Sequence, residues 1–185
     1  MSISGEKSLE REIFKKFRTK SSSLIRKNVE KNVKLYVDSV SQRNIKNKYI
    51  GIYWPLKNEV DITSLRLKYS CALPRCEGDE RLIFCSWEEE KLTKDYKGIP
   101  SPDSSFRLSY DLISMLFIPC LAVDRNLTRL GYGGGYFDRL REDKNWRNIP
   151  CIGVLTSNCV SNNLLSRDDW DIPLSGFITE KEILV

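Results

Sequence analysis

The stretch LISMLFIPCLAVDRNLTRLGYGGGYFDRL, residues 112–140, decides how this chain folds. Residues 112–123 are the most apolar segment of the chain and are typical of a central strand that runs out near Pro119. Four glycines follow within five positions, and a charged helix is expected from there to about Asp143. A buried strand, a glycine-rich turn and a helix in this order favour an α/β fold.

Two helices are expected before the first strand. Between Lys7 and Lys20, apolar residues recur at spacings of three and four, which indicates an amphipathic helix. Its apolar positions are Leu9, Ile13, Phe14 and Phe17. A second helix is expected after residues 21–23, with apolar positions at Leu24, Ile25, Val29, Val33 and Val37.

Strands are expected on both sides of the central segment. They are placed at 48–54, 70–73, 82–87, 150–155 and 176–179, with a short helix near Thr63. Pro74 is expected to stop the strand at 70–73, and the glycine and prolines between Lys94 and Ser105 are expected to exclude regular structure. Strands that alternate with helical patterns predict a largely parallel sheet.

The composition is that of a folded protein without a membrane span. Apolar residues make up 41% of the 185 residues and charged residues 30%. No run of about 18 apolar residues occurs, and the opening MSISGEKSLERE lacks the apolar stretch of a secretory signal. We therefore expect a cytoplasmic monomer with no membrane partner, folded as one domain over residues 1–185.

The chain has no histidine, and this limits its chemistry. Activation of a nucleophile by a Ser-His or Cys-His pair is excluded, so catalysis has to rest on carboxylates, cations, a metal or backbone dipoles. The six cysteines form no Cys-x-x-Cys pair and are interpreted as reduced core residues. A net charge of +5 suits an anionic ligand, but 30 cations against 25 anions do not indicate nucleic acid.

The glycine-rich segment, residues 129–139, carries the strongest functional signal. Glycine is expected where the backbone takes a positive φ or approaches a ligand, and a glycine turn before a helix offers free amides to a phosphate. The pattern matches neither the P-loop nor the dinucleotide fingerprint, so spacing alone leaves a plain tight turn equally open. Arg129 and Arg139 favour the phosphate, because guanidinium groups suit bidentate phosphate contacts.

Asp138 follows the loop in the first turn of the expected helix, where a carboxylate would repel a bound phosphate. A bridging Mg²⁺ removes this conflict and requires a second carboxylate from elsewhere in the chain. The alternative, which the sequence alone favours at least as much, is that Asp138 only complements the helix dipole.

A series of motifs resembles the 5-formyltetrahydrofolate cyclo-ligase family, also called methenyltetrahydrofolate synthetase. The motifs are Lys-x-x-x-Arg at Lys7 and Arg11, YIGIYWPLKNEV at 49–60, ALPR at 72–75, GIPSP at 98–102, FIPCLAVD at 117–124, RLGYGGGYFDR at 129–139 and DIPLSGFITE at 171–180. The series spans nearly the whole chain, and the glycine segment is its most specific part.

The resemblance implies a Rossmann-like three-layer α/β fold with a mostly parallel central sheet and N-terminal helices. It also implies ATP- and Mg²⁺-dependent conversion of 5-formyltetrahydrofolate to 5,10-methenyltetrahydrofolate, with release of ADP and phosphate. In the implied reaction the formyl oxygen attacks the γ-phosphate, the ring closes, and phosphate leaves.

Site residues follow from the same resemblance. ATP would be held by Lys7, Arg11, Arg129, Leu130, Gly131, Tyr132, Gly133, Gly134, Gly135, Tyr136 and Phe137. The folate would contact Trp54, Glu59, Tyr132, Gly133, Gly134, Gly135 and Tyr136. Mg²⁺ would be held by Asp138 and Asp171, and Arg129 and Tyr136 would act in catalysis.

These assignments have plainer alternatives. Lys7 and Arg11 share a helix face that Glu6 and Glu10 could neutralise in solvent. Glu59 could complete the turn before the helix near Thr63. Trp54 could be a core residue, and Asp171 has two acidic neighbours, Asp168 and Asp169.

Three residues depart from the family pattern. Trp170 stands where histidine is usual, Ser101 where glutamate is frequent, and Phe137 where tyrosine is frequent. None of them is a glycine or acidic residue of the expected site. The rival interpretations are a sugar-phosphate isomerase on a related fold and a folate-binding or nucleic-acid-binding module without turnover.

Overall fold

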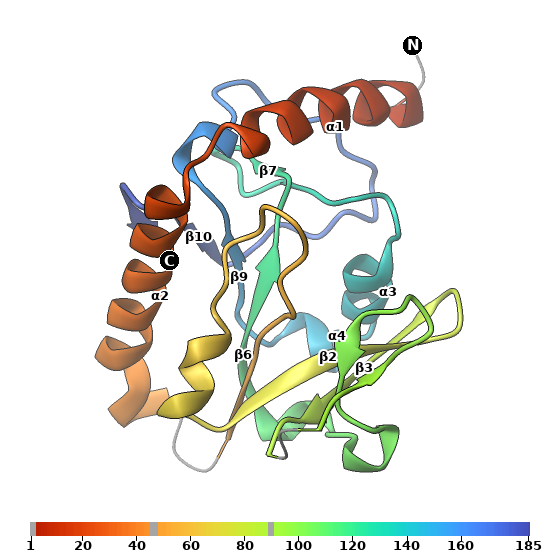
Figure 1. Cartoon of the computed structure of the whole chain (residues 1–185). Helices are drawn as coiled ribbons and strands as arrows, with labels where there is room; N and C mark the ends of the chain where they lie inside the picture. Colours follow the sequence, from red (N-terminus) through yellow and green to blue (C-terminus); the bar gives the residue numbers. More distant parts are fainter. Residues whose placement is uncertain (1–2, 45–47, 89–90) are drawn as a thin grey trace.

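The most apolar segment of the chain becomes β6, Ile113–Pro119, the middle strand of a seven-stranded sheet (Figure 1). β6 lies between β1, Tyr49–Gly51, and β9, Cys151–Val154, and is parallel to both. The structure is a computed structural model that describes residues 3–44, 48–88 and 91–185, without the side chains of residues 42–44.

The strand order places a switch point beside β6. β2, Cys71–Glu77, is parallel to β1, and β10, Gly176–Ile178, is parallel to β9. The parallel strands therefore follow the order β2-β1-β6-β9-β10, which reverses between β1 and β6. In open α/β sheets, ligands bind beyond the carboxyl ends of the strands at this reversal.

Antiparallel strands close both edges of the sheet. They are β3, Arg81–Ser86, beside β2, and β11, Ile183–Leu184, beside β10. The smaller elements are η1 (Thr63–Leu67), β4 (Thr93–Lys94), β5 (Pro100–Ser101), η2 (Ser104–Phe106), η3 (Tyr110–Leu112), β7 (Ala122–Val123), β8 (Arg129–Leu130) and η4 (Ser157–Cys159).

Helices cover both faces of the sheet, which confirms the expected three-layer fold. α2, Ser23–Asn44, packs fully buried valines against the face that includes Met115 and Phe117. α3, Tyr136–Glu142, and α4, Lys144–Arg147, pack against the opposite face. The strands alternate their side chains between these two cores, as strands buried on both sides must.

α1, Ile3–Thr19, crosses the carboxyl ends of the strands (Figure 1). The predicted helix is confirmed, but of its four apolar positions only Phe14 is buried. Leu9, Ile13 and Phe17 expose 53%, 41% and 39% of their surface. Because α1 lies across loops and not on the sheet, it contacts them mainly through polar side chains.

The expectation that Pro74 ends a strand was wrong. β2 continues through Pro74 to Glu77 and stays paired with β3 throughout. The amide of Cys76, two residues on, donates to Asp95 Oδ2 at 2.9 Å and so points away from β3. Alternate residues of a strand point the same way, so the nitrogen of Pro74 faces away from β3 too and removes no bond from that pairing.

The stretch 94–105, expected to be irregular, contains one half of a short hairpin. β4 and β5 pair through Thr93–Ser101 and Lys94–Pro100. Asp95 makes the turn possible, because its Oδ1 accepts from the amides of Lys97 and Ile99 at 2.9 Å. Because the Asp95 side chain bonds to the backbone of the turn, the two residues of β4 can pair with the two residues of β5 in spite of the prolines.

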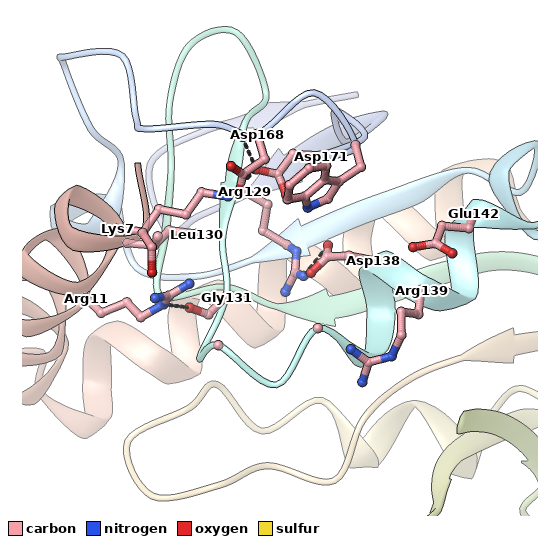
Figure 2. Close-up of a pocket in the computed structure, with 14 residues that line it drawn as sticks. Lys7, Arg11, Arg129, Leu130, Gly131, Asp138, Arg139, Glu142, Asp168 and Asp171 are labelled. Carbon is pink, nitrogen blue, oxygen red and sulfur yellow. Dashed lines mark hydrogen bonds and ion pairs between the residues drawn. The ribbon is translucent and has the colours of Figure 1, made fainter. Parts of the chain in front are cut away.

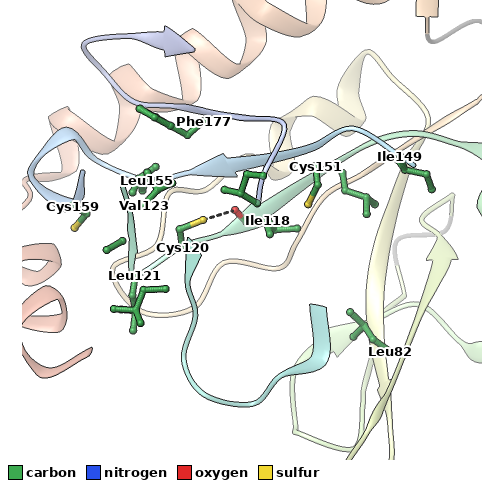
Figure 3. Packing of buried hydrophobic residues seen from close by; sticks show 14 of the residues in the cluster. Leu82, Ile118, Cys120, Leu121, Val123, Ile149, Cys151, Leu155, Cys159 and Phe177 are labelled. Atoms are coloured by element: carbon green, nitrogen blue, oxygen red, sulfur yellow. Dashed lines mark hydrogen bonds between the residues drawn. The ribbon is translucent and has the colours of Figure 1, made fainter. Parts of the chain in front are cut away.

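The six cysteines are free and buried, which confirms their interpretation as reduced core residues. Cys120, Cys151 and Cys159 pack among aliphatic side chains on one face of the sheet (Figure 3). Burial raises the pKa of the Cys120 thiol to about 12. Among the helices of the described chain, none is long and apolar enough to cross a membrane.

Candidate functional site

The glycine loop, residues 131–135, lies where the topology places a ligand. β7 follows β6 and pairs with β8, so the loop after β8 lies beyond the carboxyl end of the central strand. α3 begins directly after the loop at Tyr136. The first amides of a helix have no acceptor within it, so this junction offers hydrogen-bond donors.

Two glycines of the loop have conformations that other residues rarely adopt. Gly133 has a φ of 98° and Gly135 a φ of 66°. A Cβ atom at Gly135 would lie 2.5 Å from Nη1 of Arg139, and one at Gly131 would lie 2.9 Å from Nη1 of Arg129. The glycines therefore permit the turn and also leave room for two guanidinium groups.

A polar pocket of about 500 Å³ opens beside the loop (Figure 2). It is lined by Ser4, Lys7, Arg11, Arg129, Leu130, Gly131, Gly133, Gly135, Asp138, Arg139, Glu142, Asp168, Trp170 and Asp171. This lining includes both predicted metal ligands and most of the residues predicted to hold ATP.

Arg129 and Asp138 form an ion pair in this pocket, with 2.7 Å between Nη2 and Oδ1. The Arg129 side chain is only 9% exposed. Burial would raise the pKa of Asp138, but the guanidinium outweighs it and holds the pKa of this carboxyl below its usual range. Asp138 is therefore ionised, and its negative charge is stabilised by Arg129 as well as by the amino end of α3.

Lys7 is buried between two carboxylates. Its Nζ donates to Asp168 Oδ2 at 2.7 Å and also to Asp171 Oδ2. Burial would lower the pKa of Lys7, but the two carboxylates outweigh it, so the pKa lies above its ordinary value. Lys7 therefore remains an ammonium group at neutral pH, inside the pocket.

Arg11 lies one turn further along α1, and its Nε donates to the Gly131 carbonyl at 3.0 Å. Glu6 and Glu10, the acids that could have neutralised this face, accept hydrogen bonds from Ser166 instead. The alternative of a solvated face neutralised by Glu6 and Glu10 is therefore wrong: Arg11 bonds to the glycine loop, and Lys7 bonds to the loop that carries Asp171.

Arg139 and Tyr136 tie the glycine loop to the β2–β3 hairpin. Arg139 donates to the Gly134 carbonyl at 2.8 Å and to two carbonyl oxygens of the hairpin turn at 2.9 and 3.2 Å. The Tyr136 hydroxyl donates to the Gly78 carbonyl at 2.9 Å. These bonds fix the position of the loop and use much of the donor capacity of Arg139.

A second pocket, of about 310 Å³, is mainly apolar and shares the glycine loop as a wall. It is lined by Tyr53, Trp54, Leu56, Glu59, Pro74, Cys76, Leu82, Asp95, Lys97, Ile99, Pro119, Arg129, Tyr132, Gly134, Gly135, Tyr136 and Phe137. Of the residues predicted to contact the folate, only Gly133 lies outside this lining. Arg129 and Gly135 line both pockets.

The loop residues divide between the two pockets. Tyr132, Gly134, Tyr136 and Phe137, which the resemblance also assigned to ATP, line the apolar pocket and not the polar one. Gly131 and Gly133 line the polar pocket. Because alternate residues of the loop reach opposite pockets, the loop forms the partition between them.

Glu59 is the buried carboxylate of the apolar pocket, with a side chain 3% exposed. Its Oε2 accepts from the Leu56 amide at 2.7 Å, and its Oε1 lies 3.5 Å from Nη1 of Arg18. Burial raises the pKa of Glu59, while the amide and the arginine oppose that rise. Asp61, not Glu59, accepts from the Thr63 amide at the start of η1.

Trp54 is half-buried and belongs to both the core and the pocket. Its ring packs edge-to-face with Trp87 at 6.0 Å between centroids, and it also lines the apolar pocket. Trp54 therefore has the packing of a core residue, and its contact with a ligand stays a prediction.

The sequence did not predict a role for two residues beside the pockets, Arg18 and Asp168. Arg18 pairs with Glu59, and Asp168 shares Lys7 with Asp171. The spacing could have revealed Arg18, because it follows Lys7 by eleven residues and Arg11 by seven, which places all three on one helix face. No local pattern separates Asp168 from Asp169.

The donor set of the polar pocket suits a magnesium ion. Asp138 uses Oδ1 for Arg129, and Asp171 uses Oδ2 for Lys7 and for the Asp168 amide. Neither of their other carboxylate oxygens takes part in a hydrogen bond within the described part of the chain. Magnesium in nucleotide sites binds one or two carboxylates together with phosphate oxygens and water. Among the described residues, no group of three or more His, Cys, Asp or Glu could hold a metal ion.

The model of the 5-formyltetrahydrofolate cyclo-ligase family matches residues 3–180, which confirms the resemblance seen in the motifs. The 5-formyltetrahydrofolate cyclo-ligase of Haemophilus influenzae is 40% identical over 63 residues, 34% of this chain and 33% of that protein. The enzyme of the same name from Escherichia coli K12 is 31% identical over 106 residues, 55% of this chain and 57% of that protein. These alignments span less than two thirds of either relative.

Solved structures extend the likeness to the whole fold. Aquifex aeolicus 5,10-methenyltetrahydrofolate synthetase matches with a TM-score of 0.77 and 28% identity, over 96% of this chain and 91% of that one. The Mycoplasma pneumoniae 5,10-methenyltetrahydrofolate synthetase matches with a TM-score of 0.71 over 95% of this chain and 99% of that one. At 22% identity, the second comparison supports the fold alone.

Proposed function

The chain belongs to the 5-formyltetrahydrofolate cyclo-ligase family, and we propose that it converts 5-formyltetrahydrofolate to 5,10-methenyltetrahydrofolate with ATP and Mg²⁺. The observation that carries this proposal is the pair of pockets that meet at one glycine loop. One pocket is polar and lined by four cations and four carboxylates, the other is mainly apolar, and Arg129 and Gly135 line both. A reaction between a nucleotide phosphate and a pterin needs two such sites in contact.

The polar pocket suits the ATP phosphates. Lys7, Arg11 and Arg129 supply positive charge from α1 and from the strand before the loop. The loop amides add donors that approach closely because the loop lacks side chains. Mg²⁺, held by Asp138 and Asp171, would neutralise negative charge on the phosphate oxygens.

The apolar pocket suits a pterin ring. Trp54, Tyr132 and Phe137 offer flat apolar surfaces to the ring faces. Glu59 is positioned to accept hydrogen bonds from the amide and amine donors at the ring's polar edge. Buried surroundings strengthen such hydrogen bonds and give them directional specificity.

The work of this chain in the reaction would be positioning and charge stabilisation. Arg129 lines both pockets, so its guanidinium can stabilise phosphate charge as the formyl oxygen attacks the γ-phosphate. Arg139 and Tyr136 fix the partition that sets the distance between the two substrates. No residue has to act as an imidazole base, in keeping with a chain that has no histidine.

The direct test combines the purified protein with 5-formyltetrahydrofolate, ATP and Mg²⁺ and follows the absorbance of the methenyl product. We expect product only when all three are present. Product without ATP, or none with every component present, would overturn the proposal.

Two matched variants test the magnesium ligands. Asp138→Asn should reduce kcat by about 100-fold, because it removes a charge that holds the ion. Asp79→Asn is the control, since Asp79 pairs with the exposed Lys97 and lines neither pocket. Full activity in Asp138→Asn would remove the metal role.

A second comparison separates the neighbouring acids. Asp171→Asn should raise the Mg²⁺ concentration needed for half-maximal activity more than Asp168→Asn does, although both variants weaken the contact with Lys7. Equal effects would mean that the two acids act only on Lys7.

A further inference from the structure

Arg18 is a partly buried arginine in the last turn of α1, and it lies behind Glu59 and outside the walls of both pockets. Its side chain is 14% exposed. Nη2 donates to the Lys57 carbonyl at 3.1 Å, and Nη1 donates to Glu59 Oε1 at 3.5 Å. Arg18 therefore contacts both the carboxylate and the backbone turn that carries it.

The same guanidinium packs on the glycine loop. Its Cζ lies 4.9 Å from the centroid of the Tyr132 ring. Tyr132 lines the apolar pocket together with Glu59. Cation–π attraction is stronger where water is excluded, so this contact fixes the plane of the guanidinium beside the carboxylate.

Two polar atoms here are buried and have no hydrogen-bond partner within the described residues, Arg18 Nε and the Tyr132 hydroxyl. A cavity of about 10 Å³, lined by Arg18 and Glu59 but not by Tyr132, lies beside Arg18. Folded proteins leave few buried polar atoms unpaired. Of the two, only the Tyr132 hydroxyl belongs to a residue that lines the apolar pocket, so it is the one that a ligand there could pair with.

We propose that Arg18 is a positioning residue for folate binding, which holds the Glu59 carboxylate ionised and in one orientation toward the pterin. This inference rests on the proposed function. Arg18 acts through Glu59 and does not itself touch the substrate. The second anchor, at the Lys57 carbonyl, explains why an arginine is needed: its fork reaches two acceptors at once, whereas a lysine offers one point charge.

Among the charged groups that the structure describes near Glu59, Arg18 is the one that favours the ionised carboxylate. Tyr53 is buried, and burial raises its pKa well above the ordinary value. The pKa of Cys120 is raised to about 12, so both groups are neutral at physiological pH. Asp61, two residues further along the chain, is an exposed carboxylate that bonds to Thr63. The charged groups elsewhere in the same pocket lining are Asp95, Lys97 and Arg129.

The expected signature is a pH-dependent affinity for folate. Burial raises the pKa of Glu59 and Arg18 opposes that rise, so removal of Arg18 raises the pKa further. The carboxyl then binds a proton at higher pH and loses its acceptor charge as the pH falls. Folate binding by such a variant should weaken toward low pH and recover toward high pH.

The experiment compares Arg18→Met with the unmodified protein across about pH 6.5 to 8.5. We expect the KM for 5-formyltetrahydrofolate to rise about tenfold at the acid end and less than about threefold at the alkaline end. The kcat and the KM for ATP should change little. Arg18→Lys should restore part of the affinity, because it returns the charge without the fork.

Two further variants separate positioning from packing. Arg18→Met combined with Glu59→Gln should show the pH-independent KM of Glu59→Gln alone. Arg125→Met is the matched control, since Arg125 also pairs with a carboxylate, Glu182, and lies over a ring, Phe177, away from both pockets. It should leave the pH profile unchanged.

The outcomes distinguish this inference from the proposed function. A KM in Arg18→Met that is unchanged, or raised by one factor at every pH, overturns the role of Arg18. Folate binding, followed by isothermal titration calorimetry, gives the same pH comparison without turnover. A protein that binds folate in this way but forms no methenyl product overturns the proposed reaction and supports the inference.

Discussion

The two pockets beside the glycine loop hold their charges in different ways. In the polar pocket, cations and carboxylates are paired with one another, Arg129 with Asp138 and Lys7 with Asp171. In the apolar pocket, the Glu59 carboxylate is fixed by the Leu56 amide and by Arg18 behind it. The polar pocket can exchange partners when phosphates and a metal ion arrive, whereas the apolar pocket holds its carboxylate ready before any ligand binds.

The largest effect should come from a residue that belongs to both pockets. Gly135→Ala forces a side chain into a positive φ and places it against Arg139. Because the partition shifts, we expect kcat/KM to fall about 100-fold for ATP and for folate alike. Steady-state kinetics with each substrate varied will check this.

Gly98→Ala is the control for that experiment. Gly98 also has a positive φ, of 76°, but no atom lies within 4 Å of a Cβ placed there. It should lose about 1 kcal/mol of stability and keep its activity. A loss confined to one substrate in Gly135→Ala would show that the loop does not act as a common wall.

A charge on the polar side should matter for one substrate only. Lys7→Met removes a buried ammonium group and should raise the KM for ATP by roughly tenfold or more, since hydrogen bonds to charged groups are worth about 1.5–3 kcal/mol. The KM for folate should not change. Lys34→Met removes a partly exposed helix pair with Glu30, away from both pockets, and serves as the control. Equal effects on both substrates would break the division between the pockets.

Replacement of Trp54, an aromatic residue of the apolar pocket, should have a smaller effect, and on the KM for folate instead of the KM for ATP. Trp54→Leu should raise the KM for folate about fivefold and leave that for ATP unchanged, because stacking on aromatic rings contributes about 0.5–1.5 kcal/mol. Trp146→Leu removes a ring stacked on Phe84 outside both pockets and should lower stability without a change in either KM. An unchanged folate KM in Trp54→Leu would make Trp54 a core residue only.

The smallest effect is expected at Tyr136, which the resemblance assigns to catalysis. Its hydroxyl donates to the Gly78 carbonyl, so Tyr136→Phe should lower stability by about 1 kcal/mol. The kcat should fall less than about tenfold if the hydroxyl only holds the loop. A larger fall in kcat with unchanged thermal stability would instead support a chemical role for the hydroxyl.

The sequence predicted best where local pattern and burial agree. The segment 112–123 is apolar on both faces, as a central strand of an α/β sheet is, and Pro119 and the glycines after it are those of a strand that ends in a turn. The hairpin of β4 and β5 was not predicted, because the side chain of Asp95 closes its turn. The continuation of β2 through Pro74 was not predicted either, because it depends on the proline nitrogen facing away from β3. Neither property is visible in composition or periodicity.

The candidate site divides in the same way. The residues of the glycine loop are contiguous, so one motif located them together. The pairs of Lys7 with Asp168 and Asp171 join residues more than 160 positions apart, and Arg18 reaches Glu59 across 41 positions. Such contacts depend on how α1 crosses the sheet, and the exposed face of that helix was itself unexpected.

The buried thiols can report how often the strands of the sheet separate from one another. The thiolate is the reactive form of cysteine, and burial raises the pKa of Cys71 in β2 to about 12 and that of Cys85 in β3 to about 11. A small alkylating reagent should therefore label the native chain only as fast as each strand separates from its neighbours. Mass spectrometry of partially labelled protein would rank the strands by how often they come apart, without any engineered probe.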